Sequence, residues 1–282
     1  MLGRGGSSIV YRVRDQLSGA LYALKAIPVD DASAGDAARE AALHARLRHP
    51  HVVRYFGCVL HVEDNGGARY LCVLMEEMLA TLDGPLYSGR LDAGTVRHVV
   101  CGVAAGVAYL HARPERIWHG DLKLENAGVV RGPGGELTVL VADFGAAMAA
   151  LSTTTRTKSG GDKFTATYVS KERFQGLCGP CEADDMWALG WMVVELCAGR
   201  RVHQFTPPLE FGTWAAAPDV LDKHVAFVGR VDATLGSLVV RALRRSGPPL
   251  HARDIVEALG EGGGRGSDLE AILCGAHVRA PC

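Results

Sequence analysis

The stretch of sequence that decides the fold reads His119-Gly120-Asp121-Leu122-Lys123-Leu124-Glu125-Asn126, and Asp143-Phe144-Gly145 follows it after a short predicted strand. By itself, a His-x-Asp triplet is explained by default as a capped helix end beside a polar loop. Here a lysine follows the aspartate by two positions and an asparagine follows it by five. Asp121 can accept the proton of an attacking hydroxyl group, while Asn126 and Asp143 offer the hard oxygen ligands that Mg²⁺ prefers. These residue types in this order are what metal-assisted phosphoryl transfer requires.

A β-hairpin is predicted between the two groups. Residues 126–130 and 137–142 read as strands, and residues 131–136 read as the turn between them. The hairpin would bring Asn126 and Asp143, which are 17 residues apart, close enough to share one metal ion. Gly145 would supply a flexible joint after the second aspartate.

These motifs resemble those of the eukaryotic protein kinase family, serine/threonine type. The resemblance covers residues 2–259 and implies an α+β, two-lobed fold with a small β-rich N-lobe and a larger, mainly helical C-lobe. It implies three regions: a nucleotide-binding N-lobe at 1–80, a C-lobe with the catalytic loop, activation segment and substrate-binding region at 81–259, and a flexible tail at 260–282. The sequence around residues 49–57, together with residues 143–146, is similar to MAP kinase kinase kinase relatives.

The N-terminal segment is rich in glycine and then alternates as a strand should. Glycines allow backbone amides to approach phosphate oxygens closely. The resemblance implies that Gly3 and Gly5 cover a triphosphate, with Ser8 at the family's third glycine, and that Leu2 and Val10 flank the adenine. In the family the first strand begins several residues earlier. We therefore expect the N-lobe to be truncated at its first strand, because either the sequence is a fragment or the edge strand is half missing.

An isolated lysine, Lys25, lies between apolar residues of the next predicted strand. A strand lysine is usually a solvated edge residue. The resemblance instead places Ala23 and Lys25 at the family's Ala-x-Lys position, where the ammonium group binds the α and β phosphates of ATP. Glu40 lies on a predicted helix marked by Leu43 and Leu47, at the family's usual distance before a His-Pro pair, and is expected to pair with Lys25.

Residues 70–78 form an apolar run that ends in charged residues and resembles the last N-lobe strand and the hinge. In that alignment Met75 is the gatekeeper, although a plain core role is equally compatible with its chemistry. The backbone of Glu76 to Met78 is expected to offer hydrogen bonds to adenine.

The arginine that the family carries before the catalytic aspartate is Gly120 in this chain. That arginine normally grips a phosphorylated activation loop through bidentate hydrogen bonds. Residues 146–172 are rich in serine and threonine and resemble an activation segment, with an ordinary polar loop as the alternative. We expect loop phosphorylation to matter less here, or to be read by another basic residue. Thr165 and Lys123 resemble the serine/threonine branch, in which the lysine touches the transferring phosphate.

Helices are predicted in the C-lobe at residues 95–111, 184–196, 232–245 and 252–259. Asp184 is expected to cap the second of these helices. The resemblance implies that Asp185 holds the backbone of the catalytic loop.

Composition argues against several partners. With 30 basic and 31 acidic side chains the net charge is −1, so no bulk field attracts nucleic acid or an anionic membrane. The longest uncharged apolar run, residues 99–110, is too short to span a bilayer, so we expect a buried helix and no membrane insertion.

Eight scattered cysteines without a signal peptide suit reduced thiols and a cytoplasmic location. Cys178-Gly179-Pro180-Cys181 has the letters of a redox motif but lies in a predicted loop, and a zinc site would need two further ligands.

The resemblance implies an ATP-dependent protein serine/threonine kinase with ATP and Mg²⁺ as cofactors. Its catalytic residues would be Asp121, Lys123 and Asn126, with Asn126 and Asp143 as metal ligands. Its partners would be protein substrates with Ser or Thr acceptors and an upstream kinase or regulator. Two alternatives remain. A pseudokinase scaffold in signalling is suggested by the short first strand and the altered residues 170–172. A small-molecule kinase is suggested by the spelling His119-Gly120-Asp121, and Lys123 argues against it.

Overall fold

The computed structural model describes residues 1–4, 8–64, 67–84, 91–132, 134–149, 168–177, 179–202, 217–244, 248–260, 269 and 272–273. The chain divides into two compact units, Met1–Met78 and Leu79–Cys282. The sequence placed this division between residues 80 and 81. Each unit is described by itself below.

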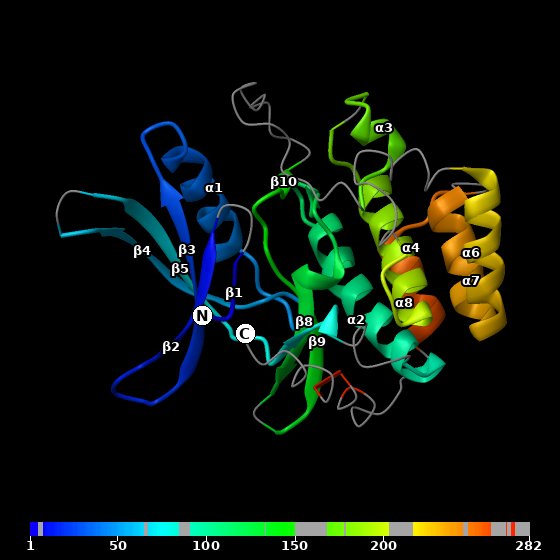
Figure 1. Cartoon of the computed structure of the whole chain (residues 1–282), viewed down its shortest axis with the longest axis horizontal. Helices are drawn as coiled ribbons and strands as arrows, with labels where there is room; N and C mark the ends of the chain where they lie inside the picture. The colour runs from blue at the N-terminus through cyan, green and yellow to red at the C-terminus, as the bar shows by residue number, and fades with distance from the viewer. Residues whose placement is uncertain are drawn as a thin grey trace. The chain divides into compact units, whose positions relative to one another are not determined.

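The N-terminal unit is built on an antiparallel sheet whose described strands run in the order β1-β2-β3-β5-β4 (Figure 1). The strands are β1 (Gly3–Arg4), β2 (Ile9–Arg14), β3 (Leu21–Val29), β4 (Tyr55–Val62) and β5 (Arg69–Met75). The first strand is only two residues long and pairs Gly3 with Val10.

Helix α1 (Ala34–Ala45) packs against β3, β4 and β5. The central strand β3 alternates buried and more exposed residues, as a strand with one covered face should. Its buried side chains join those of the helix in one cluster, made of Ile27, Val29, Ala37, Ala41 and Val73. The predicted helix is present and buries Ala37, Ala41 and His44. Two of these three residues are alanines, whose small side chains let the helix approach the sheet closely. Leu47, one of the two residues that marked the helix in the sequence, is buried just beyond its end.

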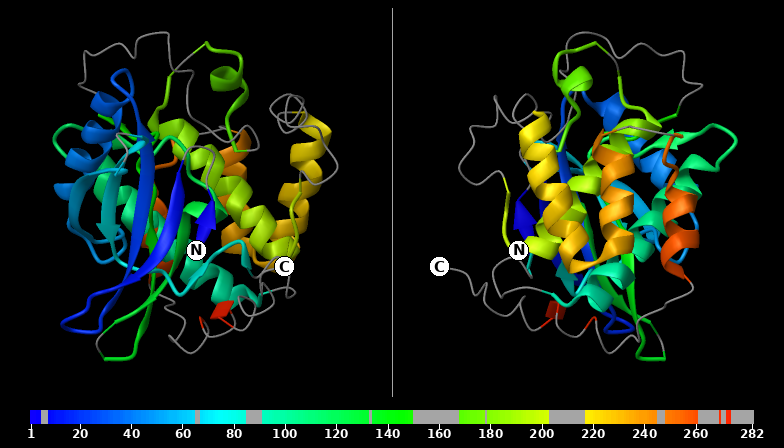
Figure 2. Two further views of the ribbon diagram at one scale, coloured as in Figure 1. Left: turned by 60° about the vertical axis from the view of Figure 1, so that its left-hand side comes forward. Right: turned by 90° about the vertical axis from the view of Figure 1, so that its right-hand side faces the viewer.

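The C-terminal unit is mainly helical, as Figure 2 shows. Its longer described helices are α2 (Ala93–His111), α4 (Glu182–Ala198), α6 (Pro218–Val231), α7 (Ala233–Arg244) and α8 (Ala252–Gly260). The helix pairs α2 with α8, α4 with α7, and α6 with α7 lie against each other. The fold class predicted from the sequence is confirmed, since a β-sheet unit is followed by a helical unit.

Helix α2 is the core helix of this unit. Asp92 caps it by accepting the Thr95 N–H at 3.0 Å, and valines repeat along its buried side. Among the described residues it is the one helix long and apolar enough to cross a membrane by length and composition. Its most apolar window is 56% buried inside the protein, and the helix packs against α8, β9 and α4. The predicted buried helix is therefore present.

The C-terminal unit also contains short strands. They are β6 (Ala80–Thr81), β7 (Ile117–Trp118), β8 (Ala127–Arg131), β9 (Leu137–Val141) and β10 (Met148–Ala149). Strands β8 and β9 form the predicted hairpin, β6 pairs with β8, and β10 pairs with β7. Thr81, where the C-lobe was predicted to begin, is thus the second residue of a strand.

Two further predictions need correction. Helix α4 begins at Glu182 with Cys181 at its N-cap, so Asp184 lies in the first turn and does not cap the helix. Leu269 and Ile272 belong to the predicted flexible tail, yet both are fully buried, because apolar side chains are stabilised by removal from water.

Candidate active site

The hairpin brings the two candidate metal ligands to the same end of its strands. Ala127 pairs with Val141, and the Ala142 N–H donates to the Asn126 carbonyl at 2.8 Å. Asn126 ends a short 3-10 helix, η2 (Leu124–Asn126), and Asp143 follows Ala142 directly. The register therefore holds residues 126 and 143 one position apart across the hairpin.

Asp121 is the centre of a small polar cluster. Its Oδ2 accepts from Lys123 Nζ at 2.8 Å and from Asn126 Nδ2 at 3.1 Å. The same Asn126 amide donates to the Asp121 carbonyl at 2.8 Å. Because both bonds of Asn126 use Nδ2, its Oδ1 is the atom that can face a cation. The three residues that the sequence named as catalytic are thus brought together.

Asp143 has a left-handed backbone, with φ at +64°. This region is uncommon for residues other than glycine, and such conformations cluster at functional sites. Its Oδ1 accepts the Gly145 N–H at 3.2 Å, a local contact that fixes the carboxylate. Mg²⁺ is commonly bound by one or two carboxylates together with substrate phosphates. Asp143 offers a carboxylate oxygen and Asn126 an amide oxygen, which are ligand types that suit Mg²⁺ when substrate phosphates supply the remaining oxygens. Among the described residues no three His, Cys, Asp or Glu side chains gather as a metal site.

His119 ties the two halves of the site together. The imidazole is fully buried, its Nε2 lies 3.0 Å from the Ala142 carbonyl, and its ring centroid is 5.6 Å from that of Phe144. Since Ala142 also donates to Asn126, one residue links the segment 119–126 to Asp143. We call residues 119–126 the catalytic segment.

Asp185, in the first turn of α4, anchors the catalytic segment. Its carboxylate accepts the N–H groups of His119 and Gly120, each at 2.9 Å, and lies 2.8 Å from His111 Nε2. Burial alone would raise the pKa of Asp185, but the hydrogen bond and charge of His111 and the Gly120 N–H hold it below its ordinary value. The predicted role of Asp185 in holding the backbone is confirmed.

Replacing Asp185 with Asn is expected to lower the free energy of unfolding by about 3 kcal/mol at pH 7, since it disrupts a buried charged network. The pKa of Asp185 is lower in the folded chain, so its contribution is present above its unfolded pKa, about 3.9, and is lost as the pH falls through the folded value. Urea unfolding at several pH values should therefore show the two proteins converging in acid. If the difference in free energy of unfolding between the two proteins stayed constant down to pH 3, the lowered pKa of Asp185 would not be its cause.

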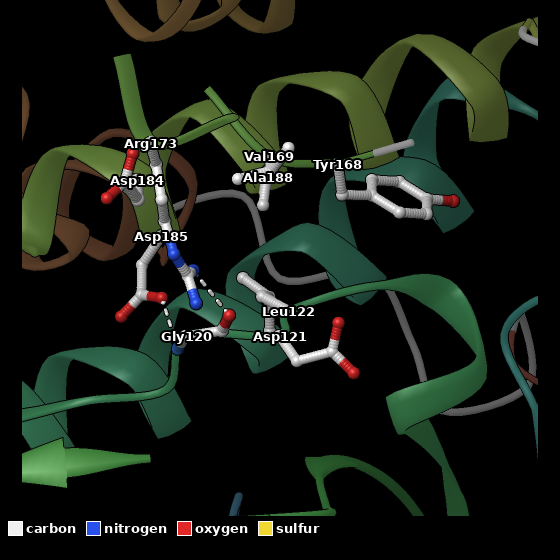
Figure 3. A pocket seen from close by; sticks show the side chains of 9 residues that line it. All are labelled: Gly120, Asp121, Leu122, Tyr168, Val169, Arg173, Asp184, Asp185 and Ala188. Carbon is white, nitrogen blue, oxygen red and sulfur yellow. Dashed lines mark hydrogen bonds between the residues drawn. The ribbon is translucent and has the colours of Figure 1, made fainter. Parts of the chain in front are cut away.

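A small cavity lies behind the catalytic segment (Figure 3). Its volume is about 10 Å³, enough for about one water molecule and far too small for a nucleotide. The Asp121 carboxylate points away from the Arg173 and Asp185 side of this cavity. The cavity therefore does not bind the nucleotide, and the residues that line it belong to the packing that holds the catalytic segment in place.

The N-terminal unit holds the predicted phosphate-binding lysine. Lys25 Nζ lies 2.7 Å from Glu40 Oε1, and the two side chains are only 11% and 14% exposed. The ion pair joins β3 to α1, as expected from the sequence. A buried lysine needs such a partner, because an unpaired buried charge is strongly destabilising.

The residues expected around adenine lie on neighbouring strands. Val10 pairs with Lys25, and Ala23 pairs with Met75. The Glu76 N–H donates to the Arg54 carbonyl at 2.9 Å, so this N–H is already used within the unit. The prediction for adenine is then left with the Glu76 carbonyl and the backbone groups of Glu77 and Met78.

The remaining residues named for the nucleotide site are peripheral or undescribed. Leu2 is 43% exposed, and its N–H donates to the Val10 carbonyl at 2.8 Å. Among the described residues that are not its chain neighbours, none comes within 4 Å of where a Gly3 side chain would begin. Met78 is half-buried at the end of this unit. Gly5 and Thr165 lie outside the described residues.

Cys181 does not have the properties of a redox thiol. Burial, together with the charge of Asp184, raises the pKa of Cys181 to about 11. A reactive thiol has a lowered pKa. The thiol lies 3.3 Å from Asp184 Oδ2, which is a structural contact. Cys178 lies outside the described residues.

A charge cluster that includes one residue of the catalytic segment was not predicted. Arg201 lies 3.1 Å from Glu195 and also contacts the Glu125 carboxylate and the Tyr168 hydroxyl. It links η2 to the end of α4. Its partners are far apart in the sequence, so no spacing signal could have found it.

The fold and the cluster of Asp121, Lys123 and Asn126 define the class of the chain as that of the protein kinases. The model of the protein kinase domain matches residues 1–209 of the chain. The chain belongs to the protein kinase domain family.

Curated relatives agree with this membership. The chain is 32% identical to human mitogen-activated protein kinase kinase kinase 6 over 74% of its own length and 16% of the relative's. It is 32% identical to Arabidopsis thaliana mitogen-activated protein kinase kinase 7, covering 71% of the chain and 62% of that protein. It is 28% identical to serine/threonine-protein kinase sid1 of Schizosaccharomyces pombe, covering 79% of the chain and 45% of that protein. The chain thus spans less than two thirds of each of these relatives.

Proposed function

We propose that the chain transfers the γ-phosphoryl group of ATP to serine or threonine hydroxyls of protein substrates. The observation that carries this proposal is the hydrogen-bonded cluster of Asp121, Lys123 and Asn126 at the open end of the hairpin that leads to Asp143. The names of the relatives support a place in signalling, with an upstream kinase or regulator. The cytoplasmic location stays a prediction from the cysteine content of the sequence.

Each residue has a distinct role in this proposal. Asp121 aligns the acceptor hydroxyl and receives its proton. Lys123, 2.8 Å from Asp121 in the structure, offsets charge on the moving phosphoryl group. Lys25, held by Glu40, binds the α and β phosphates. Asn126 and Asp143 would hold Mg²⁺, which when bound neutralises charge on the phosphates. Catalysis is then mainly positioning and electrostatics.

The test is a screen of acceptors with Mg-ATP. We expect transfer to peptides with Ser or Thr and much less transfer to matched Tyr peptides, because Lys123 is typical of the serine/threonine branch. Nucleotide binding without transfer to any acceptor would favour the pseudokinase scaffold. Transfer only to an aminoglycoside or choline would favour the small-molecule kinase. Either result would overturn the proposal.

Replacing Lys25 with Met is expected to lower kcat/KM for ATP by about 30-fold, since charge-assisted hydrogen bonds contribute about 1.5–3 kcal/mol. Glu40→Gln should have a smaller effect of the same kind, because the lysine charge remains. Steady-state kinetics at varied ATP measure both. Lys223→Met, on an exposed position of α6, is the matched control and should match the wild type. Equal kinetics for Lys25→Met and the control would refute the role of Lys25.

A further inference from the structure

Gly120, the residue directly before Asp121, is hydrogen-bonded to a charged side chain at both its N–H and its carbonyl group. Its N–H donates to Asp185 Oδ1 at 2.9 Å, and its carbonyl accepts from Arg173 Nη1 at 2.6 Å. Figure 3 shows Arg173 reaching from α3 (Lys171–Phe174) to the carbonyl while Asp185 holds the N–H. Both charged residues are buried, with Arg173 only 4% exposed and Asp185 only 1% exposed.

The backbone conformation at Gly120 explains why these two hydrogen bonds, which we call the clamp, are needed. Gly120 has φ at +75°, and a Cβ placed there would lie 2.8 Å from the Ala146 carbonyl oxygen. A residue with a side chain would therefore clash with Ala146 or be strained. Glycine avoids this clash, but it has more conformational freedom than any other residue. The direction in which the chain leaves Gly120 towards Asp121 must therefore be fixed from outside.

The Gly120 carbonyl belongs to the peptide group that joins it to Asp121. A hydrogen bond to this oxygen fixes the orientation of that planar peptide group, which includes the backbone N and Cα atoms of Asp121. Arg173 is suited to this task because its guanidinium is planar and always charged. A hydrogen bond from a charged donor is about twice as strong as a neutral one.

Arg173 is itself held in place through its own helix. Ser170 caps α3 by accepting the Arg173 N–H at 3.3 Å, and its hydroxyl donates to Asp184. Asp184 is next to Asp185 on α4, so both hydrogen bonds to Gly120 lead back to the same turn of one helix. The contacts form a closed loop: α4, α3, the catalytic segment and α4 again.

We propose that Arg173 is a positioning residue for Asp121: it locks the Gly120–Asp121 peptide from the carbonyl side while Asp185 locks Gly120 from the N–H side. Arg173 makes this contact from a segment 53 residues away in sequence. Through it, the part of the chain that follows the predicted activation segment acts directly on the catalytic aspartate. The catalytic consequence rests on the proposed function, whereas the structural consequence does not.

The test compares Arg173→Met with the wild type and with Arg253→Met, an arginine on α8 whose side chain is 73% exposed. We expect Arg173→Met to lower kcat by about 100-fold, the loss typical of a small misplacement of a reacting group, with KM for ATP within about twofold. Hydrogen exchange should be at least about tenfold faster at the Gly120 and Asp121 amides and unchanged in α2. Arg253→Met should match the wild type in both measurements.

The outcomes separate the positioning role from a structural one. If Arg173→Met lowers only the melting temperature, and kcat per folded molecule stays within twofold of the wild type, the proposal is overturned. If the wild type transfers no phosphoryl group, the proposed function fails, and exchange at Gly120 alone decides the clamp: faster exchange in the variant supports it and equal exchange refutes it.

A second variant covers the case in which Arg173→Met does not fold. Arg173→Lys keeps the charge and one donor but loses the planar fork. For this variant we expect kcat to fall by about tenfold and exchange at Gly120 to be faster. Values equal to those of the wild type in both measurements would overturn the proposal.

Discussion

Replacing Asp121 with Asn is expected to lower kcat by about 10³-fold while nucleotide binding is retained. In the proposed mechanism Asp121 receives the proton of the acceptor hydroxyl, and general base catalysis contributes about 10²–10⁴-fold. The hydrogen bonds from Lys123 and Asn126 orient the Asp121 carboxylate, and asparagine has the same shape without the negative charge. Single-turnover transfer from labelled ATP, with calorimetry of nucleotide binding beside it, measures both quantities.

Asp219→Asn is the matched control for this substitution, since Asp219 is exposed on α6 of the same unit. We expect it to keep wild-type kcat. If Asp121→Asn retained more than a tenth of wild-type kcat, Asp121 would not be the base.

Replacing Asp143 with Asn is expected to lower the rate of phosphoryl transfer by about 10³-fold or more, an effect at least as large. The reason is that a bound metal ion stabilises the charge of the transition state by several kcal/mol. The substitution is chosen for the backbone. Asp143 has a left-handed φ of +64°, a region that asparagine adopts more readily than most residues. The hydrogen bond from the Gly145 N–H can also be kept by the asparagine oxygen.

The distinguishing measurement for Asp143→Asn is the effect of Mg²⁺ on nucleotide affinity. In the wild type Mg²⁺ should tighten ATP binding, and in the variant this tightening should be lost while metal-free binding is unchanged. The melting temperature of the variant, compared with that of Asp219→Asn, tests whether the fold is intact. Equal tightening by Mg²⁺ in both proteins would remove Asp143 from the metal site.

The parts of the site that could be predicted are those encoded locally. Asp121, Lys123 and Asn126 lie within six residues, so their spacing fixes their contacts once the short helix η2 forms. The hairpin was predictable because two apolar strands flank a polar turn, and its register then places Asp143 beside Asn126. The Lys25–Glu40 pair, by contrast, was expected only from the family resemblance.

The residues that escaped prediction act across long separations. Arg173 and Gly120 are 53 residues apart, and Arg201 and Glu125 are 76 residues apart. Neither pair belongs to a periodic pattern, so only the tertiary structure reveals it. The absence of an arginine at position 120 was visible, but nothing in the sequence showed that Arg173 would supply a guanidinium there.

Helix α6 was missed although the sequence contains a weak signal for it. Proline at the first helical position, Pro218, favours a helix start, and the buried residues Leu221 and Val228 are seven positions apart. Two buried residues are too few to outweigh the charged and polar residues around them. Helix α1 was predicted from the spacing of Leu43 and Leu47, whereas the residues that it buries between Ala34 and Ala45 are Ala37, Ala41 and His44.

The most direct test of the central claim is the rate of phosphoryl transfer from ATP to a serine peptide as Mg²⁺ is increased, for the wild type and for Asp143→Asn. We predict a saturating rise with Mg²⁺ in the wild type and no rise in the variant. Transfer that is independent of Mg²⁺, or a folded wild type that binds ATP and transfers nothing at any Mg²⁺ concentration, would contradict the account.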